Sequence, residues 1–369
     1  MSKFYYSLGL MSGTSGDGVD ASIIQSDGDT KYEVISDKYF KYNQDIYENI
    51  HNLKDKINNF KDLKNLSEAS ESLEKKITLF HAKAVDEIIK DSKANIDLIG
   101  FHGQTIFHNA KIKISKQLGN GELLSQLTKK TVIYNFRQND LKNGGQGAPL
   151  TPIFHKLLAE KFKIAPVTFL NLGGIANMTK IYDDYVFHAS DVGPGMCLID
   201  EWIRLNSKKK YDESGKIAQS GKINKLILNQ ALENLIYEQK KKKNPLWFEK
   251  QVSYDTNDFS LDFVRGLSLE DGAATLTEYT VRRLLPILNI SKEMIVLCGG
   301  GRKNKFLIDG IKKYNIPLKF IDDFGVDGDF VESQSFAYLA IRTYLNLPIS
   351  FPDTTGVKTP CVGGSIFKS

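Results

Sequence analysis

The chain has 369 residues, enough for two domains with a core each, and its 41% hydrophobic and 25% charged content is typical of a soluble globular protein. The net charge of +5 is mild, and the two basic runs, Lys208–Lys210 and Lys240–Lys243, are interpreted as solvated surface rather than as a nucleic-acid site. No apolar run reaches the length of a membrane-spanning helix, and no secretion signal precedes the first elements. We therefore expect neither a membrane nor a nucleic-acid partner.

The cysteines point to a reducing compartment. Cys197, Cys298 and Cys361 are too few and too scattered for a disulfide framework, and no C-x-x-C pair is present. A cytoplasmic location is the simplest expectation.

The chain opens on two predicted strands, residues 5–10 and 19–24, that flank a turn rich in glycines and hydroxyls. Such a turn exposes backbone N–H groups and suits an anion such as phosphate. An ordinary hairpin turn is the alternative, because both the P-loop pattern and the dinucleotide fingerprint are absent. The candidate phosphate-binding residues are Ser12, Gly13, Thr14, Ser15, Gly16, Asp17, Gly18, Val19 and Asp20.

Further along the first half, a strand is expected over residues 32–42, and apolar residues at steps of three and four predict a helix over 66–90. Two short strands follow, residues 96–101 and 131–134. They run directly into polar residues that include His102 and Arg137. Because ligands bind at the carboxyl edge of an α/β sheet, this edge is a candidate site.

The second half repeats the outline of the first. After a helix over 152–162 come strands around the turn Gly173-Gly174, then Asp191 in a Gly- and Pro-rich turn, and later a strand that ends in Gly299-Gly300-Gly301. We therefore expect two related halves with a boundary near residue 165. The other predicted elements are strands 167–172, 178–182, 185–188 and 294–298, and helices 196–205, 223–239, 271–288, 304–313 and 332–345.

Each glycine turn alone is weak evidence, but the three form a set. Two hairpin turns can hold a triphosphate through N–H groups, and a strand-to-helix turn lets the backbone approach a base and ribose. Together they predict a nucleotide site.

Several motifs resemble one family along nearly the whole chain. The chain resembles the 1,6-anhydro-N-acetylmuramic acid kinase family, within the actin-like ATPase superfamily that includes acetate and sugar kinases. The motifs are Met11-Ser12-Gly13-Thr14-Ser15, Asp17-Gly18-Val19-Asp20, His102-Gly103-Gln104-Thr105, Asn135-Phe136-Arg137, Gly144 to Leu150, Asn171 to Asn177, Asp191 to Gly195, Asp271 to Thr275, Gly299 to Gly301, Ser350-Phe351-Pro352 and Thr354 to Val357.

The resemblance implies an α/β fold of two related ribonuclease-H-like lobes, each a mixed five-stranded sheet flanked by helices, with a nucleotide cleft between them. The lobes would be residues 1–165 and 166–369, with the last helix and tail packing back on the first. The implied reaction uses ATP and Mg²⁺ to phosphorylate O6 of the anhydro sugar while water opens the ring, in peptidoglycan recycling. A homodimer is implied in the same way.

The resemblance also implies roles for single residues. Asp191 would be the general base that takes a proton from water, and the alternative is a helix N-cap. His102, Arg137 and Glu332 would face the sugar, with Arg137 pairing with its carboxylate; a surface salt bridge and a helix-dipole charge are the alternatives. The adenosine side would be lined by Gly299, Gly300, Gly301 and Asn304. Asp17 or Asp20 would serve the metal, and Asp20 could instead be structural.

The chain departs from the usual family pattern at four places. Gly16 stands where leucine is common, which we expect to loosen the phosphate turn. Val192 and Met196 replace a threonine and an asparagine, so two polar groups near the base are expected to be missing. Met11 occupies the position where the wider superfamily has an aspartate. Residues 244–258 fit the family pattern poorly.

Three rival functions remain open from the sequence. One is a sugar or acid kinase of the same superfamily that leaves the anhydro ring closed. Another is a chaperone-like or regulatory ATPase, although no stretch is long enough for a peptide-binding domain. The third is a relative that binds ligand without turnover.

Overall fold

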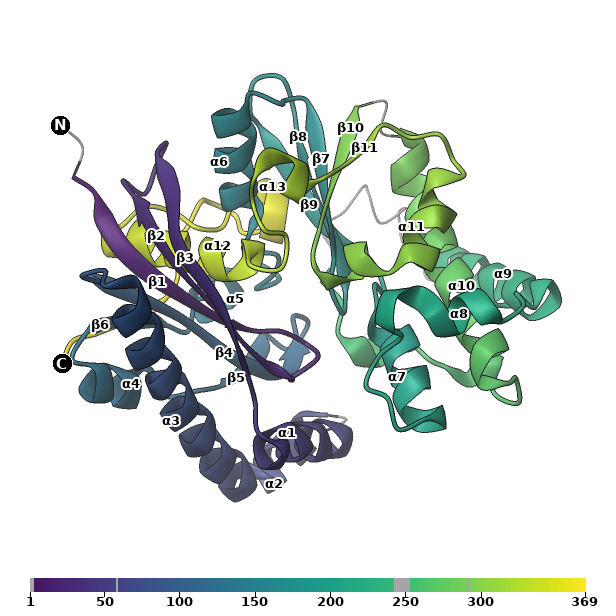
Figure 1. The fold of residues 1–369 in the computed structure, drawn as a ribbon, viewed down its shortest axis with the longest axis horizontal. Coiled ribbons are helices and arrows are strands. Elements are labelled where there is room, and N and C mark those ends of the chain that lie inside the picture. The colour runs from purple at the N-terminus through teal and green to yellow at the C-terminus, as the bar shows by residue number, and fades with distance from the viewer. Residues whose placement is uncertain (1–2, 58, 242–252, 291–292) are drawn as a thin grey trace. The chain divides into compact units, whose positions relative to one another are not determined.

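The computed structural model describes residues 3–57, 59–241, 253–290 and 293–369. The chain divides into two compact units (Figure 1): unit 1 comprises residues 1–165 and 329–369, and unit 2 comprises residues 166–328. Residues 329–369, which include the last helix and the tail, belong to unit 1, the lobe on which the sequence analysis expects them to pack. Of the segment 244–258, the part up to residue 252 lies outside the described residues, as do Lys242 and Lys243.

Unit 1 is built on a sheet of seven strands rather than the predicted five. Its order is β12-β6-β4-β1-β2-β3, with β5 paired to β4. The strands are β1 (Tyr5–Ser12), β2 (Gly18–Ser26), β3 (Tyr32–Lys41), β4 (Leu98–Asn109), β5 (Ile114–Leu118), β6 (Thr131–Tyr134) and β12 (Ser365–Phe367). The two strands absent from the prediction, β5 and β12, are short additions that pair with β4 and β6.

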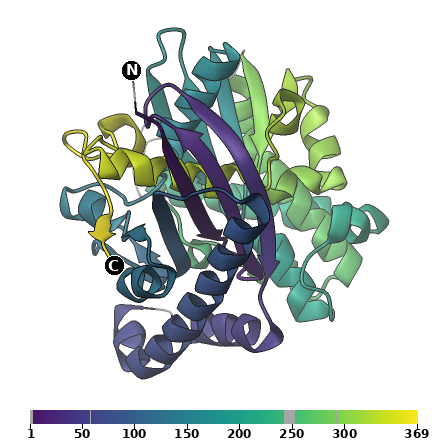
Figure 2. The same cartoon turned by 60° about the vertical axis from the view of Figure 1, so that its left-hand side comes forward.

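Helices cover both faces of this sheet (Figures 1 and 2). On one face, the side chains of α1, α3 and α4 share an apolar core with the sheet, and on the other lies α12. The helices of unit 1 are α1 (Gln44–Lys56), α2 (Phe60–Asn65), α3 (Ser67–Ser92), α4 (Gly121–Thr128), α5 (Gln138–Lys142), α6 (Pro152–Phe162), α12 (Val331–Tyr344) and α13 (Pro352–Thr355).

Helix α12 lies unusually close to the sheet because two strand residues have no side chain. A Cβ on Gly9 of β1 would be 1.9 Å from the carbonyl oxygen of Ser333, and one on Gly100 of β4 would be 2.2 Å from that of Phe336. Any side chain at these positions would push the helix away. The two glycines therefore fix the distance of α12 from the sheet.

Unit 2 has the predicted five-stranded sheet, in the order β11-β10-β7-β8-β9. Its strands are β7 (Val167–Leu172), β8 (Ala176–Ile181), β9 (Phe187–Gly193), β10 (Met294–Cys298) and β11 (Leu318–Phe320). Its helices are α7 (Cys197–Asn206), α8 (Lys216–Ser220), α9 (Lys225–Lys241), α10 (Leu269–Ile290) and α11 (Lys305–Lys312).

The two sheets share one topology. In unit 1, β1 pairs antiparallel with β2 and β2 with β3, whereas β4 runs parallel to β1 and β6 parallel to β4. In unit 2, β7, β8, β9, β10 and β11 repeat this order and these directions. The two halves are thus related by a repeated strand order, which the sequence suggested only in outline. The fold is mixed α/β with two sheets flanked by helices.

Several predicted elements were misplaced or missed. The strand predicted to end before His102 continues to Asn109, because β5 pairs with its second half. Helices α1 and α4 were not predicted, although Asn43 and Asn120 cap them through their side chains. In the described part of the chain, no helix is long and apolar enough to cross a membrane.

Buried histidines give unit 1 a dependence on pH. His81 of α3 has no exposed surface, and burial lowers its pKa to about 4 from the ordinary value of 6.5. Burial likewise lowers the pKa of His108 to about 4 and that of His155 to about 3. Below pH 6.5 the unfolded chain binds protons that the folded chain does not, so stability falls as the pH falls.

We predict that His81→Phe reduces this acid sensitivity. Removing one such group takes away roughly 1–2 kcal/mol of the stability lost between pH 6.5 and 5, because each proton changes the slope by about 1.4 kcal/mol per pH unit. Thermal melts of the variant and the parent chain across that range measure the difference. Identical slopes would contradict the prediction.

Candidate active site

In the turn between β1 and β2, the main-chain carbonyl oxygens are hydrogen-bonded to other groups of the protein. The N–H of Gly16 donates to the oxygen of Gly13 at 3.1 Å, which closes the turn. From α1, Lys54 donates to the oxygen of Thr14 at 3.0 Å, and His51 Nε2 lies 3.0 Å from the oxygen of Ser15. No described residue accepts a hydrogen bond from the N–H of Thr14 or Ser15. The turn therefore has the unused donors that an anion-binding loop needs.

Gly16 packs inside this turn. Its φ of +59° lies in the left-handed region, and a Cβ there would be 2.9 Å from the Cγ2 of Ile50 on α1. The residue is buried. The sequence suggested that glycine here loosens the turn, but the structure gives it a packing role against α1.

The side chain of Ser12, the last residue of β1, is buried beneath the turn and hydrogen-bonded within the fold. Its side chain is 1% exposed, and its hydroxyl oxygen lies 2.7 Å from the side-chain oxygen of Gln104 and 2.9 Å from the carbonyl oxygen of Gly18, two acceptors for its one hydrogen. Tyr42 donates to the same hydroxyl at 3.1 Å, and Gln104 also donates to the carbonyl of Gly13 at 3.0 Å. The Ser12 hydroxyl is thus engaged within the fold instead of facing outward as a phosphate donor.

Val19 is fully buried in the core, so only its main chain can serve a ligand. The hydroxyls of Thr14 and Ser15, in contrast, belong to exposed residues.

Two carboxylates lie beside the turn. Asp17 accepts a hydrogen bond from the hydroxyl of Ser15 at 2.5 Å. Asp20 pairs with Met11 across the β1–β2 register, so the two side chains share a face of the sheet. The Asp20 side chain therefore lies beside that of Met11, on the strand next to it. Among the described residues, no group of three His, Cys, Asp or Glu could hold a metal alone.

His102 and Arg137 are in direct contact. His102 Nδ1 donates to the carbonyl of Gly103 at 2.8 Å, which leaves Nε2 as an acceptor for Arg137 Nε at 3.1 Å and Nη2 at 2.9 Å. Arg137 Nη1 donates to the carbonyl of Gly147 at 2.8 Å. Burial and the neighbouring guanidinium hold the pKa of His102 well below its ordinary value, so the ring is neutral and orients the arginine.

Glu332 lies one helical turn from Phe336, a residue that packs on His102. It is in the first turn of α12, four residues before Phe336. The ring of Phe336 packs against the His102 ring with centroids 4.5 Å apart. Because residues four apart share a face of a helix, Glu332 belongs to the same side of unit 1 as His102 and Arg137. The fold thus joins His102 to Arg137 directly and places Glu332 on the α12 face of the same sheet.

In unit 2 a polar row crosses the sheet. Asn171 of β7 pairs with Asn177 of β8, which pairs with Asp191 of β9. Directly paired residues present their side chains on the same face. The buried Oδ1 of Asn177 has no hydrogen-bond partner among the described residues. This unsatisfied group, next to a carboxylate, marks a place where a polar ligand or water would be bound.

Asp191 lies within β9, not in a turn as predicted. Its side chain is 5% exposed, and its Oδ2 accepts a hydrogen bond from the N–H of Tyr254 at 2.8 Å. The strand gives this carboxylate a fixed direction, and the main chain of Tyr254 holds one of its oxygens.

Val192, one of the two departures near Asp191, does not share the face of the sheet that carries the Asp191 side chain. Val192 follows Asp191 in the strand, so it faces the opposite side, where it is fully buried in the apolar core. Met196 packs toward the strand-to-helix turn, where a Cβ on Gly301 would be 3.0 Å from its Cγ. The expected loss of a polar group beside Asp191 therefore does not arise from Val192.

The Gly173-Gly174 turn is held in the same way as the turn of unit 1. Its two carbonyls accept hydrogen bonds from the N–H groups of Met196 at 2.9 Å and Cys197 at 3.0 Å. The N–H groups of Gly173 and Gly174 donate to no described residue.

The Gly299–Gly301 turn connects β10 to α11. Gly299 has a φ of +80°, and its Cβ would be 2.2 Å from the side-chain oxygen of Asn171, whereas a Cβ on Gly300 would meet nothing within 4 Å. Asn304 caps α11 by accepting from the N–H of Leu307 at 3.0 Å, and its buried Nδ2 has no partner among the described residues. Gly300 therefore offers open space, and Asn304 a free donor, to a ligand.

Arg302 fixes this turn and was missed from the sequence. Its side chain is 4% exposed and forms a two-bond pair with Asp322, at 2.8 and 2.9 Å. It also donates to the carbonyl of Gly299 at 3.2 Å and contacts Asp327 at 3.3 Å. The guanidinium lowers the pKa of the Asp322 carboxyl. A lone arginine after three glycines carries no pattern that would reveal these partners.

Comparisons with known proteins agree over the whole chain. A family model described as anhydro-N-acetylmuramic acid kinase matches residues 5–369. The chain is 54% identical to a Pelagibacter ubique protein of that name, with 100% of both chains covered. It is 37% identical to one from Zymomonas mobilis, covering 97% of this chain and 98% of the other. A solved activator of 2-hydroxyisocaproyl-CoA dehydratase from Clostridium difficile is a distant likeness, at 10% identity and a TM-score of 0.45 over 91% of this chain and 94% of the other.

We predict that Arg302→Lys weakens nucleotide binding about tenfold and lowers the melting temperature. Lysine keeps the charge but cannot form the two-bond pair that holds the Gly299 turn. Equilibrium titration with a fluorescent ATP analogue and a thermal melt measure the two effects. Arg282→Lys, in an exposed pair with Glu278 on α10, is the matched control and should change neither.

Proposed function

The chain belongs to the anhydro-N-acetylmuramic acid kinase family, and we propose that it uses ATP to phosphorylate O6 of 1,6-anhydro-N-acetylmuramic acid while water opens the anhydro ring. The products are N-acetylmuramic acid 6-phosphate and ADP, in the recycling of cell-wall peptidoglycan. The observation that carries the chemistry is the buried carboxylate of Asp191 at the end of a polar row in unit 2.

Asp191 is proposed as the general base. Its carboxylate takes the proton of a water molecule as the water oxygen bonds to the anomeric carbon. The bond from that carbon to O6 breaks, O6 receives the γ-phosphoryl group, and ADP leaves. The N–H of Tyr254 donates to one carboxylate oxygen of Asp191 at 2.8 Å and fixes the direction of the carboxylate. The neighbouring Asn177, with its unsatisfied Oδ1, is suited to accept a hydrogen bond from the same water.

His102, Arg137 and Glu332 are proposed as the sugar-side residues. Arg137 is preorganised by His102 and Gly147, so little freedom is lost when its guanidinium meets the carboxylate of the muramic acid. His102 acts through Arg137 because its ring is neutral and fully engaged. Glu332 would accept a hydrogen bond from a sugar hydroxyl.

The three glycine turns fit a nucleotide. The turns at Gly13–Gly18 and Gly173-Gly174 both have carbonyls tied to the fold and N–H groups that are free among the described residues, which suits phosphate oxygens. Gly300 gives a base and ribose room to approach, and the Nδ2 of Asn304 lacks an acceptor that the nucleoside would supply.

Mg²⁺ would be held by phosphate oxygens, waters and at most one or two carboxylates, because the described chain has no three-residue metal cluster. Asp20, opposite Met11, and Asp17 at the end of the turn are the candidates. The ion would neutralise charge on the transferred phosphoryl group. A nucleotide cleft between the lobes and a homodimer remain expectations from the family.

We predict that Asp191→Asn lowers kcat by at least about a hundredfold, because loss of a general base typically costs that factor. The dissociation constant for ATP should change little. A coupled ADP-release assay and calorimetry measure the two quantities. Near-normal turnover in the variant would exclude Asp191 as the base.

Isotope labelling separates ring opening from simple transfer. Turnover in ¹⁸O water should place one label at the anomeric carbon of the product, as mass spectrometry of the sugar phosphate would show. An unlabelled product with a closed ring would identify a plain sugar kinase.

We further predict that Asp20→Asn raises the Mg²⁺ concentration needed for half-maximal activity about tenfold or more, because a carboxylate is lost from the metal's surroundings. Asp17→Asn is the comparison that distinguishes the two candidates. If the Asp20→Asn variant needs the same Mg²⁺ concentration as the parent chain, Asp20 does not bind the metal and its role is structural.

A further inference from the structure

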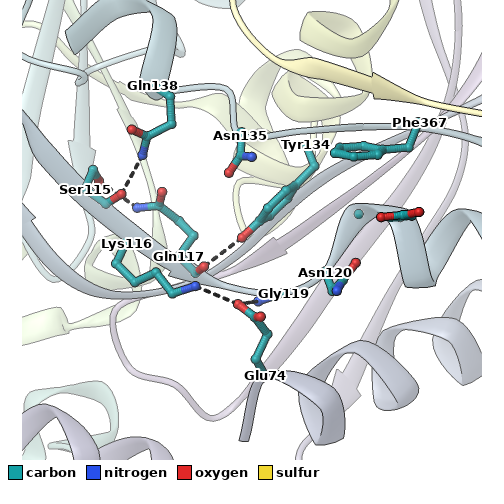
Figure 3. A pocket seen from close by; sticks show the side chains of 12 residues that line it. Glu74, Ser115, Lys116, Gln117, Gly119, Asn120, Tyr134, Asn135, Gln138 and Phe367 are labelled. Atoms are coloured by element: carbon teal, nitrogen blue, oxygen red, sulfur yellow. Dashed lines mark hydrogen bonds and ion pairs between the residues drawn. The ribbon is translucent and has the colours of Figure 1, made fainter. Parts of the chain in front are cut away.

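Unit 1 contains a cavity of about 320 Å³ that none of the roles above uses (Figure 3). It lies where β5 and β6 meet the start of α4 and the side of α3. It is lined by Glu74, Ser115, Lys116, Gln117, Gly119, Asn120, Gly121, Glu122, Tyr134, Asn135, Gln138 and Phe367.

The cavity and the sugar-side residues lie on opposite faces of the sheet. Tyr134 packs against Phe101, which in turn contacts His81 of α3. The next residue of β4, His102, faces the other way and packs on Phe336 of α12. The wall of the cavity formed by Tyr134 therefore lies on the α3 and α4 face, opposite the face on which His102 packs against α12.

Asn135 lies between two residues whose side chains point to opposite faces of the sheet. The φ of Asn135 is +61°, which breaks the alternation of side chains along the strand. Tyr134 therefore faces the cavity, whereas the ring of Phe136 packs against the ring of Phe336 on α12, with centroids 5.2 Å apart. The side chain of Asn135 makes no hydrogen bond with any described residue. An unpartnered amide that lines a cavity offers both a donor and an acceptor to a ligand.

The other amides of the cavity are partly used, each leaving a defined group. Gln117 donates both N–H hydrogens, to Thr105 and Ser115, which leaves its carbonyl oxygen. Gln138 donates to the carbonyl of Ser115 at 2.6 Å, which also leaves its oxygen. Asn120 caps α4 with its oxygen, and its NH₂ remains. The cavity thus presents acceptors and donors together, which matches a hydroxyl-bearing ligand.

The charges do not suit an anion. Lys116 is paired with Glu74 at 2.8 Å, and Glu74 also accepts from the N–H of Gly119 at 3.3 Å, as Figure 3 shows. Glu122 adds a second carboxylate. A phosphate or nucleotide would therefore meet net negative charge, whereas a neutral molecule would not.

The aromatic lining and the volume narrow the ligand class further. Tyr134 and Phe367 give one side of the cavity two rings, against which the C–H face of a pyranose can pack, as hydrophobic and aromatic walls do in small-molecule sites. The volume is at the small end of such sites. We propose that this cavity is a second binding site, which takes one neutral, hydroxyl-rich molecule of monosaccharide size.

The test uses N-acetylglucosamine as the probe, with the full chain and saturation-transfer NMR together with calorimetry. Asn135→Gly removes the free amide and keeps the left-handed backbone, and Asn120→Asp removes the NH₂ and keeps the cap oxygen. Each should weaken probe binding about fivefold or more, since one neutral hydrogen bond is worth that factor. Asn346→Gly, at an exposed left-handed asparagine outside the cavity, is the matched control and should have no effect.

Binding of the probe should persist in Arg137→Ala, because that residue lies on the other face. The proposal is overturned if the parent chain does not bind the probe, or if binding is lost in Arg137→Ala and unchanged in Asn135→Gly, which would assign it to the substrate site alone. Phosphate binding that depends on Asn135 would overturn the neutral ligand class. The Asp191→Asn and isotope assays test the catalytic proposal, and their outcome does not depend on whether the cavity binds the probe.

Discussion

The close packing of α12 on the sheet of unit 1 is the contact on which the substrate side depends. It exists because Gly9 and Gly100 present no Cβ to the helix backbone. At that distance Phe336 reaches the His102 ring, and the helix start brings Glu332 to the same side. His102 and Phe336, which are far apart in the sequence, are thus in contact because Gly9 and Gly100 have no Cβ atom.

Much of the fold and site could be predicted because the informative signals are local. The period of 66–90, the short apolar strands and the glycine turns each specify an element from adjacent residues, and β6, β7, β10 and α6 match their predicted bounds. The proposed sugar-side residues came from the family resemblance, with His102 and Arg137 next to predicted strands and Glu332 at the start of a predicted helix. The repeated strand order explains why the two halves looked alike without matching residue by residue.

The rest depends on contacts that no local pattern encodes. Strand β5 exists because it pairs with the extended end of β4, and β12 joins the sheet from the far end of the chain. The partners of Arg302 and Ser12 lie 20 and 92 residues away. The surroundings of Gly16 and Val192, a helix in one case and the core in the other, could not be predicted because they are set by tertiary packing.

The repeated strand order has a consequence for the position of the carboxylates. In unit 1 the row across the sheet reads Met11, Asp20, Tyr39, and in unit 2 the matching row reads Asn171, Asn177, Asp191. The carboxylate occupies the second strand in one copy and the third in the other. The same backbone arrangement therefore presents its carboxylate on a different strand in each unit.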